Sequence, residues 1–272
     1  SGLSDTAVSA ASRHSPLLCI AGLASGMWRR DMYLATHHSR SVCDREERVR
    51  HAIDHGGVEA VVRAMRTHAT DGEVQTACCL ALGQLVCTPE RARSAAQVGA
   101  IELVVEALKA HPERPVLQAN ACMAVGNLAV GERLGASAAA RAADPARCTR
   151  AAQAGALGAI VAALTRHAAH DGVLHWGTAA VLRLTHDSTE RTAIALNAGA
   201  KEALASAAAL PSTRAIPAVA AKVELAHRWL AMHEHAVGGA DSGKGGAPAD
   251  EKLSKAERVF KDLVFEQCVR DE

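Results

Sequence analysis

Val74-Gln-Thr-Ala-Cys-Cys-Leu-Ala-Leu-Gly-Gln-Leu85 is the stretch that decides the fold, because it occurs again farther along the chain. It returns 43 residues later as Leu117-Gln-Ala-Asn-Ala-Cys-Met-Ala-Val-Gly-Asn-Leu128, and a weaker copy runs Val173-Leu-His-Trp-Gly-Thr-Ala-Ala-Val-Leu-Arg-Leu184. In each copy the first residue and those 8 and 11 places later are aliphatic, and those 4 and 7 places later are small. These offsets form one apolar stripe on an α-helix. The sequence therefore predicts a recurring helix with one buried face.

A glycine marks the start of each repeated unit. Gly56, Gly99, Gly155 and Gly199 precede apolar helical runs at spacings of 43, 56 and 44 residues. Glycine adopts the left-handed conformation that ends a short helix at little cost, so a sharp turn is expected at each position. The extra residues of the middle interval fall at 131–145, a predicted surface loop. Units of two or three short helices bury their apolar faces only by stacking, which predicts a solenoid.

The composition agrees with closely packed helices. Apolar residues make up 49% of the 272-residue chain but aromatic residues only 2%, so the core is expected to consist of Ala, Leu and Val. A formal net charge of +1 offers no bulk attraction for nucleic acid. Eight Cys without disulfide-framework spacing indicate reduced, buried thiols and an intracellular, cytoplasmic protein. The sequence contains no run of 18 apolar residues, so no membrane span is predicted. The presence of an upstream targeting or lipidation signal is left open.

Two short motifs resemble the armadillo repeat family. Val-Gly-Ala or Ala-Gly-Ala, similar to the turn before the family's second helix, occurs at 98–100, 154–156 and 198–200. Ala-Leu-Gly-Gln-Leu at 81–85 and Ala-Val-Gly-Asn-Leu at 124–128 resemble the end of its third helix. The resemblance covers roughly residues 44–236. It implies an all-α, right-handed α-α superhelix of four to five repeats, whose third helices line a concave groove that binds other proteins without catalysis.

The expected organisation has four parts. Residues 1–43 form an N-terminal segment with a capping helix, 44–236 the solenoid, 237–250 a flexible Gly- and Ala-rich linker, and 251–272 a C-terminal amphipathic helix. The apolar side of that last helix is costly to expose and is expected to dock. Three sites stay open: the last repeat, the protein's own groove, and a partner or second copy. The residues expected to dock are Leu253, Phe260, Leu263 and Val264.

Positions beside the buried stripe are the candidate partner-binding residues. Offsets 3, 6, 10 and 13 of each long helix lie along one side of it. The predicted groove residues are Leu80, Gln84, Met123, Asn127, Trp176 and Arg183. Two of them have a structural alternative: Trp176 could pack between repeats, and Asn127 could brace neighbouring backbone.

The resemblance also limits the partner. Family members that hold extended basic peptides pair a groove Trp with an Asn four residues later, but here the residues four before Gln84, Asn127 and Arg183 are not Trp. A partner helix or folded surface is therefore expected rather than an extended basic peptide.

No catalytic or metal-binding motif stands out. The 14 His residues lack the tight spacing of a zinc site, and no phosphate loop or nucleophile elbow occurs, so no enzyme activity, cofactor or metal is predicted. The predicted function is a non-catalytic interaction scaffold or adaptor. The alternatives are a membrane-anchored organelle scaffold with a lipidated upstream segment and a nuclear-import-type cargo adaptor.

Overall fold

The structure, a computed structural model, describes residues 53–54, 56–86, 88–130, 144–186 and 188–238. Within these ranges the secondary structure is helical, without strands. The helices are α5 (Gly57–Thr67), α6 (Gly72–Leu85), α7 (Pro89–Gln97), α8 (Ala100–Ala110), α9 (Pro115–Val130), α10 (Pro145–Gln153), α11 (Ala156–Arg166), α12 (Asp171–Thr185), α13 (Thr189–Asn197), α14 (Ala200–Ala209), α15 (Pro211–Arg214) and α16 (Pro217–Gly238).

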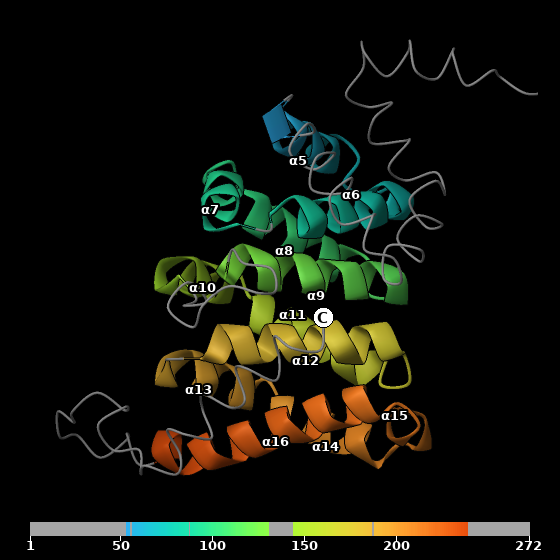
Figure 1. Ribbon diagram of the computed structural model, residues 1–272, viewed down its shortest axis with the longest axis vertical. Helices are drawn as coiled ribbons and strands as arrows, with labels where there is room; N and C mark the ends of the chain where they lie inside the picture. The colour runs from blue at the N-terminus through green and yellow to red at the C-terminus, as the bar shows by residue number, and fades with distance from the viewer. Residues whose placement is uncertain (1–52, 55, 87, 131–143, 187, 239–272) are drawn as a thin grey trace, which may run out of the picture.

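These helices form stacked units of three. α7, α8 and α9 make one unit, α10, α11 and α12 the next, and α13, α14 and α16 the last, with the short α15 between α14 and α16. α5 and α6 correspond to the second and third helices of a further unit; of residues 44–55, which precede them, the structure describes only 53–54. The third helices α6, α9, α12 and α16 follow one another down the long axis (Figure 1). The all-α solenoid predicted from the sequence is confirmed.

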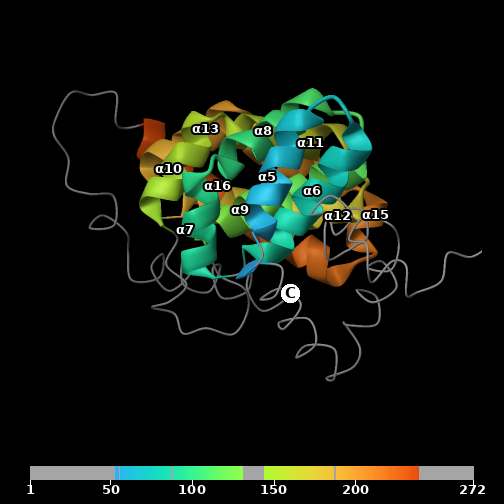
Figure 2. The ribbon, with the colours of Figure 1, turned by 90° about the horizontal axis from the view of Figure 1, so that it is seen from above.

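The glycines at the unit starts have the predicted conformation. Gly56, Gly99, Gly155 and Gly199 have φ angles of 72°, 89°, 87° and 85°, and each immediately precedes a second helix. Seen from above, the first helices α7, α10 and α13 lie at the left of the stack, and the second helices α8 and α11 lie toward its upper edge, above the third helices α6, α9 and α12 in this view (Figure 2). The sharp turn at each glycine thus brings the second helix against the third.

Small residues on the third helices let neighbouring helices approach closely, both between units and within a unit. A Cβ atom added at Gly83 of α6 would lie 2.5 Å from Met123 Cε of α9. One added at Gly177 of α12 would lie 2.8 Å from a methyl carbon of Leu164 of α11, the second helix of the same unit. Because the Ala, Leu and Val side chains around them are almost fully buried, the predicted apolar stripe is confirmed as the core.

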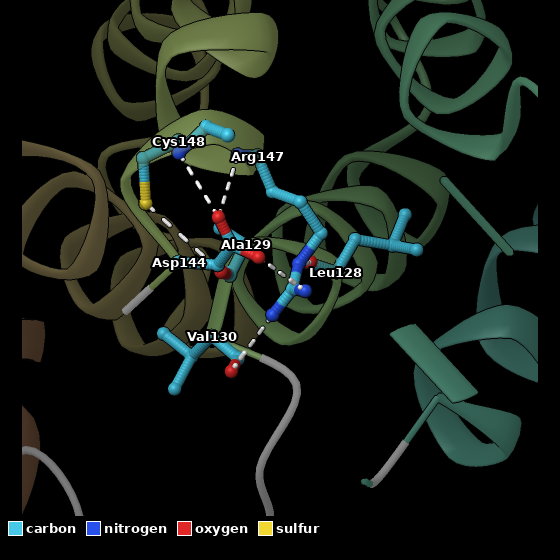
Figure 3. Close-up of polar contacts among 7 residues, drawn as sticks. Leu128, Ala129, Val130, Asp144, Arg147 and Cys148 are labelled. Carbon is cyan, nitrogen blue, oxygen red and sulfur yellow. Dashed lines mark hydrogen bonds and ion pairs between the residues drawn. The ribbon is translucent and has the colours of Figure 1, made fainter. Parts of the chain in front are cut away.

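An arginine in the first helix ties each of the last two units to the preceding third helix. Arg147 of α10 donates from Nε to the Leu128 carbonyl (2.8 Å) and from Nη2 to the Val130 carbonyl (3.2 Å), and pairs with Asp144 at 2.8 Å (Figure 3). Arg191 of α13 repeats this pattern on α12, with Nε 2.6 Å from the Leu184 carbonyl. The last carbonyls of a helix lack partners within it, so these arginines serve as C-terminal caps. Burial lowers the pKa of Arg147 from its ordinary value, because desolvation disfavours the charged form.

Amide side chains join the second and third helices within a unit. Gln75 Nε2 donates to the Met65 and His68 carbonyls, and Gln118 Nε2 donates to those of Leu108 and His111, all at 2.9 Å. Both glutamines stand one place after the start of the repeated stretch. They therefore fix the angle between the two helices in successive units.

Two histidines link the turns of successive units. His111 Nε2 lies 2.9 Å from the Ala69 carbonyl oxygen, and His167 Nε2 lies 2.8 Å from that of Pro112. No group of three or more His, Cys, Asp or Glu that could hold a metal occurs in the part of the chain that the structure describes. None of the described helices is long and apolar enough to cross a membrane.

Candidate functional site

The candidate site is the side of the third helices that flanks their buried stripe. We define the third-helix face as offsets 3, 6 and 10 of α6, α9, α12 and α16. α16 belongs to the series because Val219, Val223, Ala226 and Leu230 are buried at offsets 0, 4, 7 and 11. The face comprises Ala77, Leu80, Gln84, Asn120, Met123, Asn127, Trp176, Ala179, Arg183, Lys222, Leu225 and Trp229.

Polar side chains connect three of these helices at the centre of the face. Asn127 Nδ2 of α9 donates to the Gly83 carbonyl of α6 at 2.9 Å, and Arg183 Nη1 of α12 donates to Asn127 Oδ1 at 2.9 Å. Asn127 and Arg183 are only 7% and 4% exposed. Asn127 thus braces the backbone of the neighbouring helix, which is the structural alternative considered for it above. Contact of Asn127 or Arg183 with a partner stays a prediction.

The other predicted residues differ in exposure. Leu80 and Gln84 of α6 are partly exposed, whereas Met123 is buried. Trp176 is partly buried against the core, and its ring meets that of His175 edge-on at 4.8 Å. Leu80, Gln84 and Trp176 therefore keep some accessible surface, while Met123, Asn127 and Arg183 keep little.

Two residues that the sequence analysis missed complete the face at α16. Trp229 is 2% exposed and stacks on His186 at 6.1 Å, with His233 tilted against it at 4.1 Å. Its indole N–H is buried without a hydrogen-bond acceptor among the described residues. Lys222 is 3% exposed, with Nζ 3.4 Å from His175 Nε2. Both residues could have been predicted from the apolar stripe of α16, because they stand at offsets 3 and 10 from its first residue.

In the middle of the stack, α9 and α12 are buried on every side and not only along the stripe. Residues 121–130 of α9 and 177–185 of α12 are each an unbroken buried run. Because an α-helix turns once every 3.6 residues, runs of this length include every direction around the helix axis. Ala77, Leu80 and Gln84 of α6 are only partly buried. Burial of the face therefore extends over α9, α12 and α16 and is less complete at α6.

The chemistry of the face is apolar and cationic. Its charged members are Arg183 and Lys222, and it contains no carboxylate. Nearby thiols are unreactive by burial, which raises the pKa of Cys78 to about 11 and of Cys122 to about 12, and raises that of Cys79 still further. Such a face offers packing and positive charge rather than a nucleophile.

The predicted docking residues of the tail, Leu253, Phe260, Leu263 and Val264, lie outside the described residues.

The chain resembles solved helical-repeat structures. Two engineered proteins from a structural genomics consortium match it at 18% and 17% identity, with TM-scores of 0.56 and 0.57; the matches cover 93% and 97% of this chain and 90% and 94% of theirs. A designed armadillo repeat protein in complex with the peptide (KR)4 matches at 14% identity and a TM-score of 0.53, over 94% of this chain and 99% of its own. Neither family models nor curated proteins give a match. With the stacked units described above, these likenesses identify the fold as an armadillo-like repeat.

Proposed function

We propose that this protein is a non-catalytic scaffold that binds a partner protein through the third-helix face. One observation carries the proposal: offsets 0, 4, 7 and 11 stay apolar or small in four successive third helices, while offset 10 changes from Gln84 to Asn127, Arg183 and Trp229. Stacking uses the same kind of stripe in every unit, whereas the offset-10 side chains differ: Asn127 and Arg183 bond neighbouring third helices, and Gln84 keeps accessible surface. Variation at a fixed place beside a maintained core is expected where a surface recognises a particular partner.

The composition of the face indicates the kind of partner. Arg183 and Lys222 disfavour a lysine- or arginine-rich peptide, such as the one bound to the designed armadillo repeat protein, and therefore also a nuclear-import-type role. Two tryptophans beside two cations suit a partner helix or folded surface with apolar and acidic side chains. A phosphate backbone would require more positive charge than these two groups supply.

Trp176 is the residue to test first, because it is large and keeps accessible surface. Arg183 is less suitable, since its loss would also remove the bond to Asn127. We expect Trp176→Ala in the full chain to weaken capture of the principal partner about 30-fold or more, because truncating a hot-spot residue costs roughly 2 kcal/mol or more.

The matched control is Ile194→Ala on α13, which removes a 37% exposed apolar side chain elsewhere on the stack. Partners would be identified by affinity purification and mass spectrometry, and their binding to each variant measured by titration. Wild-type binding by Trp176→Ala, or equal loss with Ile194→Ala, would contradict the proposal. Tight binding of a lysine-rich peptide would contradict the predicted partner chemistry.

A further inference from the structure

We propose that residues 251–272 dock as a helix on the third-helix face of their own chain, over α9, α12 and α16, and so compete with the partner. The competition rests on the proposed function; the docking itself does not, and it is measured below without a partner.

Burial of the face is the first support. Offsets 3, 6 and 10 lie beside the stripe that packs into the stack, yet six of the nine side chains at these offsets of α9, α12 and α16 are no more than 7% exposed. They are Met123, Asn127, Ala179, Arg183, Lys222 and Trp229. Leu80 and Gln84 at the same offsets of α6 stay partly exposed. A cover that ends before α6 accounts for this gradient along the stack.

The length of the C-terminal segment matches that cover. A helix of the 22 residues 251–272 is about 33 Å long at 1.5 Å per residue. Packed helices lie about 10 Å apart, so the axes of α9 and α16 are separated by about 20 Å, and such a helix overlaps all three third helices. The 12 residues 239–250 after α16 span up to about 40 Å when extended, enough to place it there.

The chemistry of the segment complements the face. Its expected apolar side carries Leu253, Phe260 and Leu263, which suit the apolar side chains Met123, Leu225 and Trp229. The segment carries six carboxylates and five Lys or Arg side chains, so individual acids are available to pair with the two cations of the face, although its net charge is close to neutral. A carboxylate or carbonyl of the segment would also supply an acceptor for the buried indole N–H of Trp229, a group that usually has one.

Because residues 251–272 are joined to α16 by a short linker, even a low intrinsic affinity is enough to keep them docked on most molecules. A short flexible linker gives an effective concentration on the order of 1 mM, so a segment whose isolated peptide binds with a Kd of about 100 μM would cover about nine-tenths of the molecules. The apparent affinity for a partner then falls about tenfold, because only the open fraction binds. Release of the segment would restore it.

The test measures accessibility of Trp176 and Trp229 in the full chain by acrylamide quenching of fluorescence. Trp28, the third tryptophan, is replaced by Phe in every sample. We expect Phe260→Asp/Leu263→Asp to raise the quenching constant severalfold and a synthetic 251–272 peptide to lower it again. The control is Arg258→Asp, because Arg258 lies on the opposite side of the expected helix and its replacement changes the net charge by the same amount as the double variant. Its quenching constant should equal that of the wild type.

Four outcomes would overturn the proposal: unchanged quenching in the double variant, an equal rise in Arg258→Asp, no protection by the peptide, or quenching that falls as protein concentration increases. The last would place the segment on a second copy. Helical circular dichroism of each variant separates undocking from unfolding. Because no partner is present, these outcomes are independent of whether Trp176→Ala affects partner binding.

Discussion

Arg147 offers the sharpest test of how the units are joined. Arg147→Met keeps most of the aliphatic stem but removes three donated hydrogen bonds, to the Leu128 and Val130 carbonyls and to Asp144. Removing one member of a buried charged network costs about 3–5 kcal/mol. Asp144 is 31% exposed and can be hydrated, so we take the lower end, about 3 kcal/mol. At roughly 2–4 °C per kcal/mol for a chain of this size, Tm should fall by about 6–12 °C.

Arg166→Met is the matched control for this prediction. Arg166 pairs with Glu113, but both side chains are largely exposed, so the same substitution should cost less than about 1 kcal/mol. Thermal melts and urea unfolding followed by circular dichroism would compare the two variants. If Arg147→Met destabilises no more than Arg166→Met, the arginine cap does not hold α10 against α9.

Two further predictions concern glycines and thiols. Gly99→Ala should destabilise by about 1–2 kcal/mol, because its φ of 89° disfavours a Cβ. Gly158→Ala, in a helix where an added Cβ meets nothing within 4 Å, should stabilise by about 0.5–1 kcal/mol; urea unfolding checks both, and equal shifts would contradict the argument. Cys78, Cys79 and Cys122 should resist iodoacetamide at pH 8 until the chain unfolds, as peptide mass spectrometry would show. Because burial raises the pKa of Cys78 from 9.0 to about 11 and of Cys122 to about 12, their contribution to stability is fully present below pH 9.0 and is lost as pH rises through those values; alkaline melts unchanged up to pH 12 would contradict this.

Much of the fold could be predicted because local patterns and global packing agree. Each glycine that precedes an apolar run is a left-handed turn, and the stripe of Val74, Leu117 and Val173 leads into the core. These features depend on backbone geometry and helical periodicity, which a single sequence displays directly.

The end of the stack was harder to predict. α16 carries the stripe, but it has Arg228 where α6 and α9 have Gly83 and Gly126, and α15 interrupts the approach to it. Without the small residue and the regular spacing, the motif that reveals the other third helices is lost. Trp229 and Lys222 were missed for that reason.

Side-chain roles in the candidate site were the least predictable part. An Asn at offset 10 can face a partner or brace a carbonyl, and the register between α6 and α9 places Asn127 within reach of Gly83. Arg147 and Arg191 stand at the third position of their first helices, where an arginine often lies in solvent. Only the packing of each first helix against the preceding third helix turns them toward its last carbonyls.

The amide-to-carbonyl bonds between α6 and α9 have an evolutionary consequence. Asn120 and Asn127 donate to the main chain of Thr76 and Gly83, which presents a carbonyl oxygen whatever the side chain. Substitutions on α6 can therefore accumulate without removing the acceptors that align it with its neighbour. A lineage that duplicates or exchanges such a unit inherits its alignment with the donor helix, and the exposed positions of α6 can drift as long as Gly83 stays small.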